Sequence, residues 1–310
     1  MKKLKKAIVI LGPTASGKTD LSLRLAKEFS GEIISADSRQ VYTKMNIGTA
    51  KPEGKWRIYD KQKRYVVDGV PHYGMDIIDP GKIFTVADFQ SLSFSAIDDI
   101  TSRGKLPIIA GGTGLYIWSV VDNLRIPKNP PMKKLRKSFE NKSIEDLRVL
   151  LEKVDPESYV AIDKNNKRRL IRALEVAIST GESFVKQRKM HEPVVDALQI
   201  GLAWDLPALY ERINRRADEQ WKSGLIKEVM GLVKQKYSFD LPSMSGMGYK
   251  QVGYFLRGES SEKEALEMVK RDTRHYARRQ MTWFKRDKRI KWIEKDSYQE
   301  AEKLVKEFLK

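Results

Sequence analysis

The stretch ILGPTASGKTD, Ile10–Asp20, joins an apolar run to a glycine-rich turn and a lysine. It matches the spacing G-x-x-x-x-G-K-S/T, in which loop amides cradle a phosphate chain, at four positions, Gly12, Gly17, Lys18 and Thr19. The motif also requires a strand before it and a helix after it. The apolar run Lys6–Leu11 predicts a buried strand, and Lys18–Phe29 predicts an amphipathic helix. The stretch therefore predicts a phosphate-binding P-loop.

Further apolar segments alternate with helical ones along the chain. Strands are predicted at Glu32–Asp37, in the first part of Leu106–Tyr116, at Ala197–Asp205 and at Ile290–Glu294. This alternation predicts an α/β fold, a P-loop NTPase-like parallel sheet flanked by helices. Ligands of such sheets bind at the carboxyl ends of the strands, and three residues of interest fall there, Gly12, Asp37 and Gly111.

The pattern changes in the middle of the chain. A Pro-rich segment, residues 125–137, leads into charged helical sequence that lasts to about Pro193. We therefore expect an α-helical insertion domain at residues 125–194, between core segments 1–124 and 195–310. After the insertion, one long helix is predicted from Leu206 to Lys236. The last helix is expected to start at Ser297, which has capping-box spacing to Glu300.

The composition limits the class of protein. The 310 residues include 59 Lys and Arg against 41 Asp and Glu, a formal charge of +18, which predicts a polyanionic partner, nucleic acid first. Cysteine is absent, which excludes disulfides and thiolate metal sites. No apolar segment approaches the roughly 20 residues of a membrane span. We expect a cytoplasmic protein with no membrane contact and no obligate protein partner, a monomer by default.

A carboxylate is expected near the phosphate site. A conventional P-loop NTPase places a Mg²⁺-holding Asp at the end of an apolar strand, but here that strand ends in IIAGGTG. Asp37, in SADSRQVY, instead follows the neighbouring predicted strand. The residues alone leave two readings open. Asp37 is a metal ligand, as in small kinases, or a general base beside the bound phosphates.

Basic residues cluster near the carboxyl terminus. Residues 270–291 contain ten Lys or Arg and two acids. On a helix, one sector would carry Arg271, Arg274, Arg278 and Lys285, whereas another would carry Val269, Thr273, Tyr276, Gln280 and Phe284. We expect the second sector to pack and the first to follow RNA phosphates, with a solvated basic stripe as the alternative. The three histidines, His72, His191 and His275, lack metal-ligand spacing and are expected to be structural.

Seven motifs occur in the order of a known family: GPTASGKT, ADSRQVY, IGTAKP, GGTGLY, RRLIRALEV, GMGYKQ and RRQMTWFKR. The chain resembles the tRNA dimethylallyltransferases, also called tRNA isopentenyltransferases. Because it lacks the Cys-containing zinc module of some eukaryotic members, it resembles the shorter bacterial type. One position departs from the family pattern, because Tyr73 stands where a second His is expected after His72.

The resemblance implies a reaction. The dimethylallyl group of dimethylallyl diphosphate moves to N6 of the adenosine at position 37 of tRNA, and diphosphate leaves. Mg²⁺ is the implied cofactor, with Thr19 as its ligand. The implied diphosphate site is Gly12, Pro13, Thr14, Ala15, Ser16, Gly17, Lys18 and Thr19. The implied catalytic residues are Asp37, Thr19, Lys18 and Arg216, with Arg215 as a neighbouring alternative to the last.

The resemblance also implies contacts to the tRNA anticodon stem-loop, part of them from the insertion domain. The implied tRNA-binding residues are Asp37, Ser38, Arg39, Gln40, Thr113, Arg168, Arg169, Arg172, Gly248, Tyr249, Lys250, Arg278, Arg279, Gln280, Trp283 and Lys285. Two other functions compete with RNA prenyl transfer. A P-loop small-molecule kinase explains the phosphate motif and Asp37 but not the basic clusters. A non-catalytic RNA-binding protein explains the charge but not the complete phosphate site.

Overall fold

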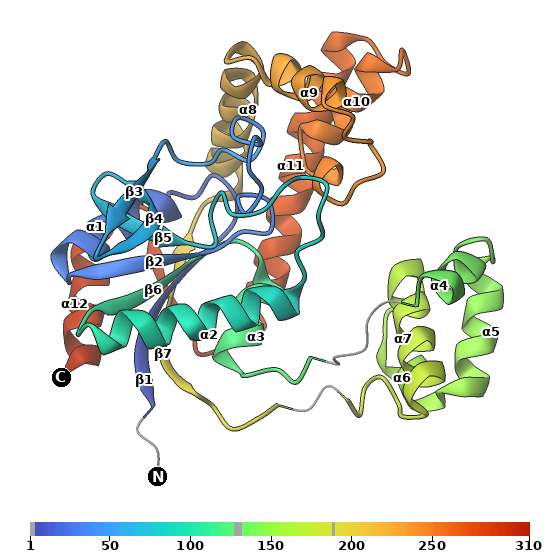
Figure 1. Cartoon of the computed structure of the whole chain (residues 1–310), viewed down its shortest axis with the longest axis horizontal. Helices are drawn as coiled ribbons and strands as arrows, with labels where there is room; N and C mark the ends of the chain where they lie inside the picture. Colours follow the sequence, from blue (N-terminus) through green and yellow to red (C-terminus); the bar gives the residue numbers. More distant parts are fainter. Residues whose placement is uncertain (1–3, 127–131, 188–189) are drawn as a thin grey trace. The chain divides into compact units, whose positions relative to one another are not determined.

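The computed structural model describes residues 4–126, 132–187 and 190–310 (Figure 1). The chain forms two compact units, one built from Met1–Val121 with Val194–Lys310 and the other from Asp122–Pro193. The larger unit contains the P-loop, and the smaller one is helical. The sequence places these boundaries at residues 124/125 and 194/195. Part of the predicted Pro-rich linker, residues 127–131, lies outside the described residues.

One sheet organises the larger unit. Its order in the described residues is β3-β4-β5-β2-β6-β1-β7-β8, and every pair from β5 to β8 is parallel. The strands are β1 (Lys5–Leu11), β2 (Gly31–Ala36), β3 (Lys55–Tyr59), β4 (Gln62–Val67), β5 (Val70–Tyr73), β6 (Leu106–Gly111), β7 (Val195–Ala203) and β8 (Lys291–Glu294). The predicted α/β fold with a parallel sheet is thereby confirmed.

Helices cover the sheet and build the smaller unit. They are α1 (Lys18–Glu28), α2 (Val86–Ser102), α3 (Gly114–Val121), α4 (Lys133–Glu140), α5 (Ile144–Val154), α6 (Pro156–Ala161), α7 (Lys167–Thr180), α8 (Leu206–Lys222), α9 (Leu225–Lys234), the 3₁₀ turn η1 (Ser243–Ser245), α10 (Tyr249–Leu256), α11 (Glu262–Phe284) and α12 (Tyr298–Leu309). Among the described segments, none is a helix of the length and apolar character that crossing a membrane requires.

The central strand β1 is buried on both faces. Val9 and Leu11 pack into a cluster with α2 and α3, whereas Ile8 and Ile10 pack into a second cluster with α1 and α12. Figure 1 shows α2 and α3 on one side of the sheet and α1 and α12 on the other. Because both faces are covered, β1 reads as a continuous apolar run rather than an alternating one.

Two local predictions are wrong, and one hairpin was missed. The predicted helix from Leu206 to Lys236 is two helices, because Gly224 adopts the left-handed conformation (φ 102°) between α8 and α9. The capping box at Ser297 is not formed, since its side chain makes no cap hydrogen bond. The antiparallel hairpin of β3 and β4 was not predicted at all, because the residues of β3 are exposed or half-buried without alternation.

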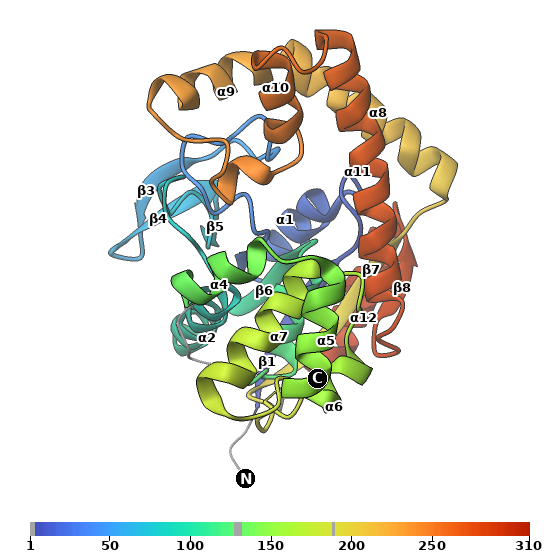
Figure 2. The same cartoon turned by 90° about the vertical axis from the view of Figure 1, so that its right-hand side faces the viewer.

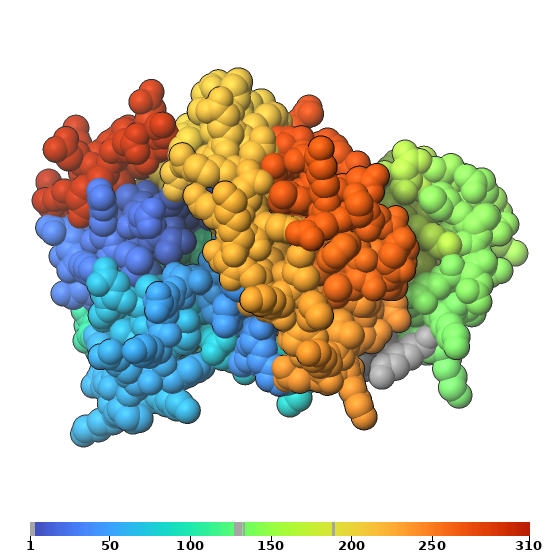
Figure 3. Space-filling model, turned by 90° about the horizontal axis from the view of Figure 1, so that it is seen from above, coloured from blue at the N-terminus to red at the C-terminus, as the bar shows by residue number. Residues whose placement is uncertain are grey.

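Helices α8 to α11 lie beyond the carboxyl ends of the parallel strands. Figure 2 shows α9 and α10 across one end of the larger unit, with α8 and α11 descending from them toward the sheet. In the space-filling view, the surface of α8 (gold) lies directly beside that of the blue N-terminal segments (Figure 3). Residues of α8, α10 and α11 therefore help to line the cavities at the strand ends.

The smaller unit has its own core. Leu147 and Leu151 of α5 pack against Leu170 and Leu174 of α7, and all four are fully buried. Asp155 joins the turns of this unit, since its carboxylate accepts hydrogen bonds from the backbone N–H groups of Ser158 and Phe184. The unit is therefore packed around its own apolar residues, as an inserted domain requires.

Candidate active site

Two adjoining cavities lie at the carboxyl ends of the parallel strands, within the larger unit. The first, the P-loop cavity, is lined by the P-loop, by Gly111 at the end of β6 and Gly112 after it, and by Arg212 of α8. The second, the inner cavity, is lined by Ser38, Ile213, Ala217, Met247 and Val269 among others. Both cavities share a boundary formed by Thr14, Ala15, Asp37, Thr49, Arg216 and Tyr276.

The P-loop has the backbone conformation that its glycines predict. Gly12 and Gly17 have φ values of 150° and 92°, which side chains rarely adopt. A Cβ atom at Gly12 would also lie 3.1 Å from Ser16 Oγ. Lys18 Nζ folds back over the loop and donates a hydrogen bond to the Pro13 carbonyl at 2.6 Å. The loop therefore presents its lysine to the cavity.

Two cations in this cavity are poorly neutralised. Burial lowers the pKa of Lys18 to about 7, with Asp37 opposing the shift and Arg216 adding to it. Burial and the nearby Arg212 likewise lower the pKa of Arg216, against the attraction of Asp37. Asp37 thus attracts both cations and Glu219 also attracts Arg216, but burial outweighs these attractions. Such a site is electrostatically suited to an anion that brings further negative charge.

The structure separates Arg216 from its neighbour. The Arg215 side chain is 70% exposed and pairs with Glu219 at 3.9 Å. Both arginines line the P-loop cavity, but Arg216 also lines the inner cavity and interacts electrostatically with Lys18 and Asp37. The geometry therefore favours Arg216 over Arg215 as the arginine that faces the phosphates.

Asp37 is held in a fixed turn immediately after β2. Its Oδ1 accepts hydrogen bonds from the backbone N–H groups of Arg39 (2.8 Å) and Gln40 (3.3 Å). Ser38 N donates to Thr113 Oγ1 at 3.1 Å, which fastens the turn to the loop after β6. No hydrogen bond to Oδ2 is formed within the described residues, so this oxygen is available at the boundary of the cavities.

The two residues after Ser38 hold other loops in place. The Arg39 guanidinium donates to the Pro242 carbonyl and to Ser245 Oγ (3.1 Å). Gln40 Nε2 donates to the carbonyls of Thr49 and Ala50 at 3.3 and 3.2 Å. Their predicted contacts to tRNA are not tested by these bonds, and both residues also line the cavities, Arg39 the inner one and Gln40 the P-loop one.

Gly248 and Tyr249 begin α10 beside the inner cavity. The Tyr249 hydroxyl donates to Glu228 Oε1 at 2.5 Å, and its ring fills the space that a Cβ of Gly48 would need. Glu228 also accepts from the N–H groups of Asn46 (2.9 Å) and two further residues, Ile47 (2.8 Å) and Gly48 (3.2 Å). Glu228 thus fixes a wall of the cavity, a role that its ordinary helical sequence context did not reveal.

Helix α11 has the two predicted sides. Val269, Gln280 and Phe284 are buried, whereas Arg278 and Arg279 are exposed. Lys285, which caps the helix, and Lys250 at the start of α10 are also exposed. Arg274 differs from the predicted stripe, because it donates to Asn214 Oδ1 at 2.6 Å and is half-buried.

Trp283 packs against the turn after β6. A Cβ atom on Gly114 would lie 2.3 Å from its ring, and the ring also meets Trp118 edge-on, with centroids 5.9 Å apart. Trp283 belongs to the core contacts on that side of the sheet. Its predicted tRNA contact is not tested, but its observed partners are protein residues.

The three arginines predicted in the smaller unit differ in exposure. Arg168 and Arg169 are exposed at the start of α7. Arg172 is half-buried and lies 3.6 Å from the buried carboxylate of Glu175, which Arg136 also binds through two nitrogens, at 3.1 and 2.7 Å. Arg168 and Arg169 are therefore the freer candidates for a phosphate contact.

The described residues contain no group of three or more His, Cys, Asp or Glu side chains that could hold a metal. Thr19 lines the P-loop cavity and is exposed there. One hydroxyl fits Mg²⁺, which commonly binds one or two protein ligands together with substrate phosphates and water.

His72 is buried, its Nδ1 lies 2.9 Å from the Val70 carbonyl, and burial lowers its pKa to about 4.

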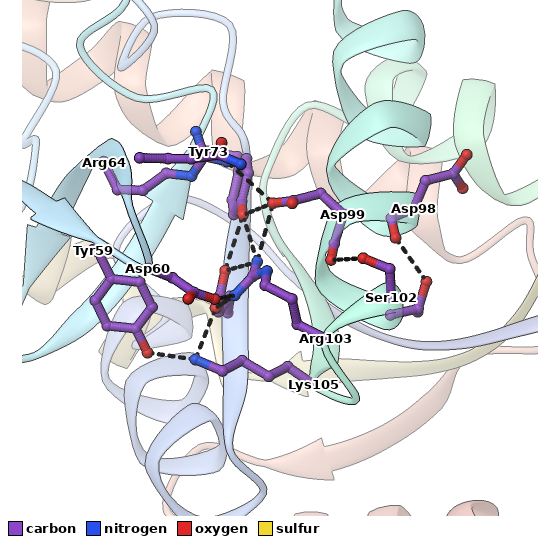
Figure 4. Close-up of polar contacts among 12 residues, drawn as sticks. Tyr59, Asp60, Arg64, Tyr73, Asp98, Asp99, Ser102, Arg103 and Lys105 are labelled. Atoms are coloured by element: carbon purple, nitrogen blue, oxygen red, sulfur yellow. Dashed lines mark hydrogen bonds and ion pairs between the residues drawn. The ribbon is translucent and has the colours of Figure 1, made fainter.

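Tyr73, at the position where a His was expected, belongs to a polar network away from the cavities (Figure 4). Its hydroxyl donates to Asp99 Oδ2 at 2.6 Å and lies 3.0 Å from Glu32 Oε2. Arg103 Nη2 donates to the same hydroxyl at 2.9 Å and to Glu32 at 2.8 Å. We call these residues, with Lys105, the Arg103 network. Tyr73 therefore has a structural role.

The chain is similar to known proteins over most of its length. The model of the family described as IPP transferase matches residues 40–287. A protein of Acetivibrio thermocellus named tRNA dimethylallyltransferase is 43% identical over 96% of this chain and 95% of its own length. A protein of Geotalea uraniireducens named tRNA dimethylallyltransferase 2 is 43% identical over 93% of this chain and 92% of its own.

Solved structures agree in fold. The tRNA isopentenylpyrophosphate transferase of Bacillus halodurans is 37% identical, with a TM-score of 0.70 over 98% of this chain and 95% of that chain. A eukaryotic dimethylallyltransferase described as acting on tRNA is 27% identical, with a TM-score of 0.76 over 98% of this chain and 77% of that chain. The matches thus extend over both units.

Proposed function

This chain belongs to the IPP transferase family and acts as a tRNA dimethylallyltransferase, and on that premise we propose that its donor is dimethylallyl diphosphate and its acceptor N6 of adenosine 37, next to the anticodon. The observation that carries the proposal is the shared boundary of the two cavities. A diphosphate in the P-loop cavity would direct its first carbon toward Asp37, where an extruded base can enter from the inner cavity.

The leaving group determines the role of the cations. As the bond between the first carbon and oxygen breaks, negative charge accumulates on the diphosphate. The P-loop amides, Lys18 and Arg216 would neutralise this charge, and Thr14 at the boundary would contact the same group. In the free protein, burial lowers the pKa of both cations despite the nearby carboxylates. The negative charge of the diphosphate would therefore stabilise the positive charges of Lys18 and Arg216.

Mg²⁺, when bound, would be held by Thr19 and the diphosphate oxygens, and would supply further positive charge to the leaving group.

Asp37 would take the proton that the acceptor loses. The amino group of adenine forms a bond to the first carbon of the donor, and one N6 proton must leave. Asp37 Oδ2 is the available acceptor, because Oδ1 is occupied by the turn.

The basic surface would hold the RNA. Arg278, Arg279 and Lys285 are exposed at the end of α11, and Arg168 and Arg169 are exposed in the smaller unit. Arginine and lysine bind the RNA backbone through phosphate oxygens. These side chains would hold the anticodon stem-loop while the reacting base occupies the inner cavity. The relatives named for tRNA modification support the proposal that the reaction takes place in the cytoplasm.

The reaction can be tested by product mass. Unmodified tRNA is incubated with the protein, Mg²⁺ and either dimethylallyl diphosphate or ATP. We expect tRNA to gain one dimethylallyl unit with the first donor only. A phosphorylated acceptor or free ADP, without that gain, would support the P-loop kinase alternative and overturn the proposal.

The role of Asp37 is tested by Asp37→Asn beside Asp37→Ala. Asparagine keeps an oxygen for the N–H groups of Arg39 and Gln40 but is not a base, whereas alanine loses both functions. We expect kcat to fall by about 10²- to 10⁴-fold in each variant while the dissociation constant for tRNA is kept. Activity close to that of the unaltered protein in Asp37→Asn would contradict the assignment.

A further inference from the structure

We infer that Gln280 is a positioning residue that ties the P-loop to the turn after β6, so that its side chain supports diphosphate binding rather than contacting RNA. The inference rests on the proposed function for its substrate. Gln280 lies on α11, the helix that carries exposed arginines, and family resemblance alone would group it with them.

Both ends of the Gln280 amide are occupied within the protein. Its Oε1 accepts a hydrogen bond from the backbone N–H of Thr14 at 2.8 Å. Its Nε2 donates to the Gly112 carbonyl at 2.8 Å. The side chain is only 6% exposed. A contact to RNA that drew this amide away from its partners would leave the Thr14 N–H and the Gly112 carbonyl without them, at a cost of about 1–3 kcal/mol for each group that stays buried.

The turn after β6 is shaped to receive this side chain. A Cβ atom at Gly112 would lie 2.3 Å from Gln280 Nε2, and Gly114 leaves similar room for Trp283 one helical turn further along α11. A glycine at each position lets the helix approach the backbone closely. The two side chains therefore dock α11 on residues 112–114.

The anchored groups are next to the proposed chemistry. Thr14 lies at the boundary of the two cavities, and its backbone position decides where its side chain meets the diphosphate. Gly112 precedes Thr113, whose hydroxyl holds the N–H of Ser38 beside Asp37. One buried amide thus fixes the phosphate loop relative to the turn that holds the base. A displacement of about 1 Å between such groups is enough to cost about 10²-fold in rate.

Two substitutions test the role of this amide. Gln280→Glu keeps an oxygen for the Thr14 N–H but places a second oxygen against the Gly112 carbonyl, and Gln280→Met removes both hydrogen bonds. Gln235→Met is the matched control, because Gln235 is exposed at the end of α9 and its side-chain amide donates to the Gly231 carbonyl of the same helix. For each protein we would measure kcat, the donor KM, the dissociation constants for inorganic diphosphate and for an anticodon stem-loop RNA, and the melting temperature.

We expect both Gln280 variants to lower kcat/KM for the donor by about 10²-fold and to weaken diphosphate binding, with the RNA dissociation constant unchanged. The control should match the unaltered protein. A weaker RNA affinity with unchanged donor parameters would overturn the inference. So would a lower melting temperature with unaltered diphosphate binding, since that result describes a merely structural residue.

Gly112→Ala tests the same contact from the other side. Its methyl group would displace the Gln280 amide, so it should reproduce the donor defect, and the double variant should be little worse than either single one. This second route decides the case if a Gln280 variant fails to fold. If the unaltered protein transfers no dimethylallyl group, the proposed function fails, but diphosphate binding still tests the position of the P-loop.

Discussion

The P-loop cavity and the Arg103 network lie at opposite ends of the same two strands. Glu32 stands near the start of β2, and Lys105 precedes β6. Asp37 and Gly112 follow the other ends of these strands. In a parallel sheet, ligands bind at the carboxyl ends. The charges of the P-loop cavity therefore lie where a ligand would bind, whereas those of the Arg103 network lie where they can stabilise only the fold.

The two regions differ in how their charges are compensated. In the Arg103 network, the buried carboxylate of Glu32 forms ion pairs with Arg103 and Lys105. Asp99 forms ion pairs with Arg103 and Arg64. The hydrogen bonds that Arg103 donates to Glu32 contribute most to the raised pKa of Arg103, despite partial burial. In the cavity, burial lowers the pKa of both Lys18 and Arg216. For these two cations, burial therefore outweighs the attraction of the neighbouring carboxylates.

This contrast teaches that the balance of charge marks the ligand site better than the number of charges. Burial raises the pKa of the Glu32 carboxyl, but hydrogen bonds from Arg103, Lys105 and Tyr73 outweigh it and lower the pKa overall. Each charge there has a partner of opposite sign. In the cavity, Asp37 acts on both cations and Glu219 on Arg216, yet burial still lowers the pKa of both, and a diphosphate would bring further negative charge.

Among the changes that test this comparison, the largest effect is expected from Arg216→Gln. The change removes a buried cation from the cavity, so kcat/KM for the donor should fall by about 10²- to 10³-fold, the size seen when one transition-state donor is lost. Arg215→Gln is the matched variant, because its side chain is 70% exposed and paired with Glu219. Steady-state kinetics with a fixed tRNA concentration measures both. Equal losses in the two variants would contradict the distinction between the neighbours.

The P-loop and Asp37 could be predicted because their signals are local. The P-loop motif spans eight residues and requires only a flanking strand and helix, both of which the structure contains. The choice between Arg215 and Arg216 could not be predicted, since the two share one helix and differ only in what covers them. Sequence spacing alone does not report tertiary burial.

The Arg103 network and the roles of Gln280 and Glu228 depend on distant segments. Tyr73 meets partners from residues 32, 99 and 103, which no local pattern connects. Gln280 was correctly expected on the packing side of its helix, but its partners, 266 and 168 residues away, were not. Glu228 resembles any surface glutamate of a helix until the loop 46–48 is placed against it. Such contacts are set by the fold, not by propensity.

A second effect, on stability and not on catalysis, is expected from Arg103→Met. The change leaves the buried Glu32 carboxylate with Lys105 as its remaining cation, and should lower the free energy of unfolding by about 3 kcal/mol. Lys27→Met is the control, because Lys27 and Asp68 form an exposed pair whose loss should cost at most about 1 kcal/mol. Urea unfolding measures both. At temperatures where the Arg103→Met variant is folded, its kcat/KM should equal that of the unaltered protein. A lower kcat/KM in the folded variant would contradict the separation of the Arg103 network from the catalytic site.

The smallest effect is expected from the titration of Lys18. Its pKa of about 7 in the free protein means that the ammonium loses its proton as the pH rises through 7, whereas a bound anion favours the protonated form. Affinity for inorganic diphosphate should therefore be highest below pH 7 and weaken above it, by at most about tenfold per pH unit.

Lys18→Arg separates this effect from the titration of the ligand. Arginine stays charged over the whole range, so the variant retains only the pH dependence that diphosphate itself contributes. Calorimetric titration from pH 6 to 9 should then show the two proteins diverging above about pH 7. Parallel curves would mean that Lys18 stays charged over this whole pH range. The cations of the cavity would then differ from those of the Arg103 network in burial alone, and the claim that a diphosphate completes the charge balance of the cavity would lose its support.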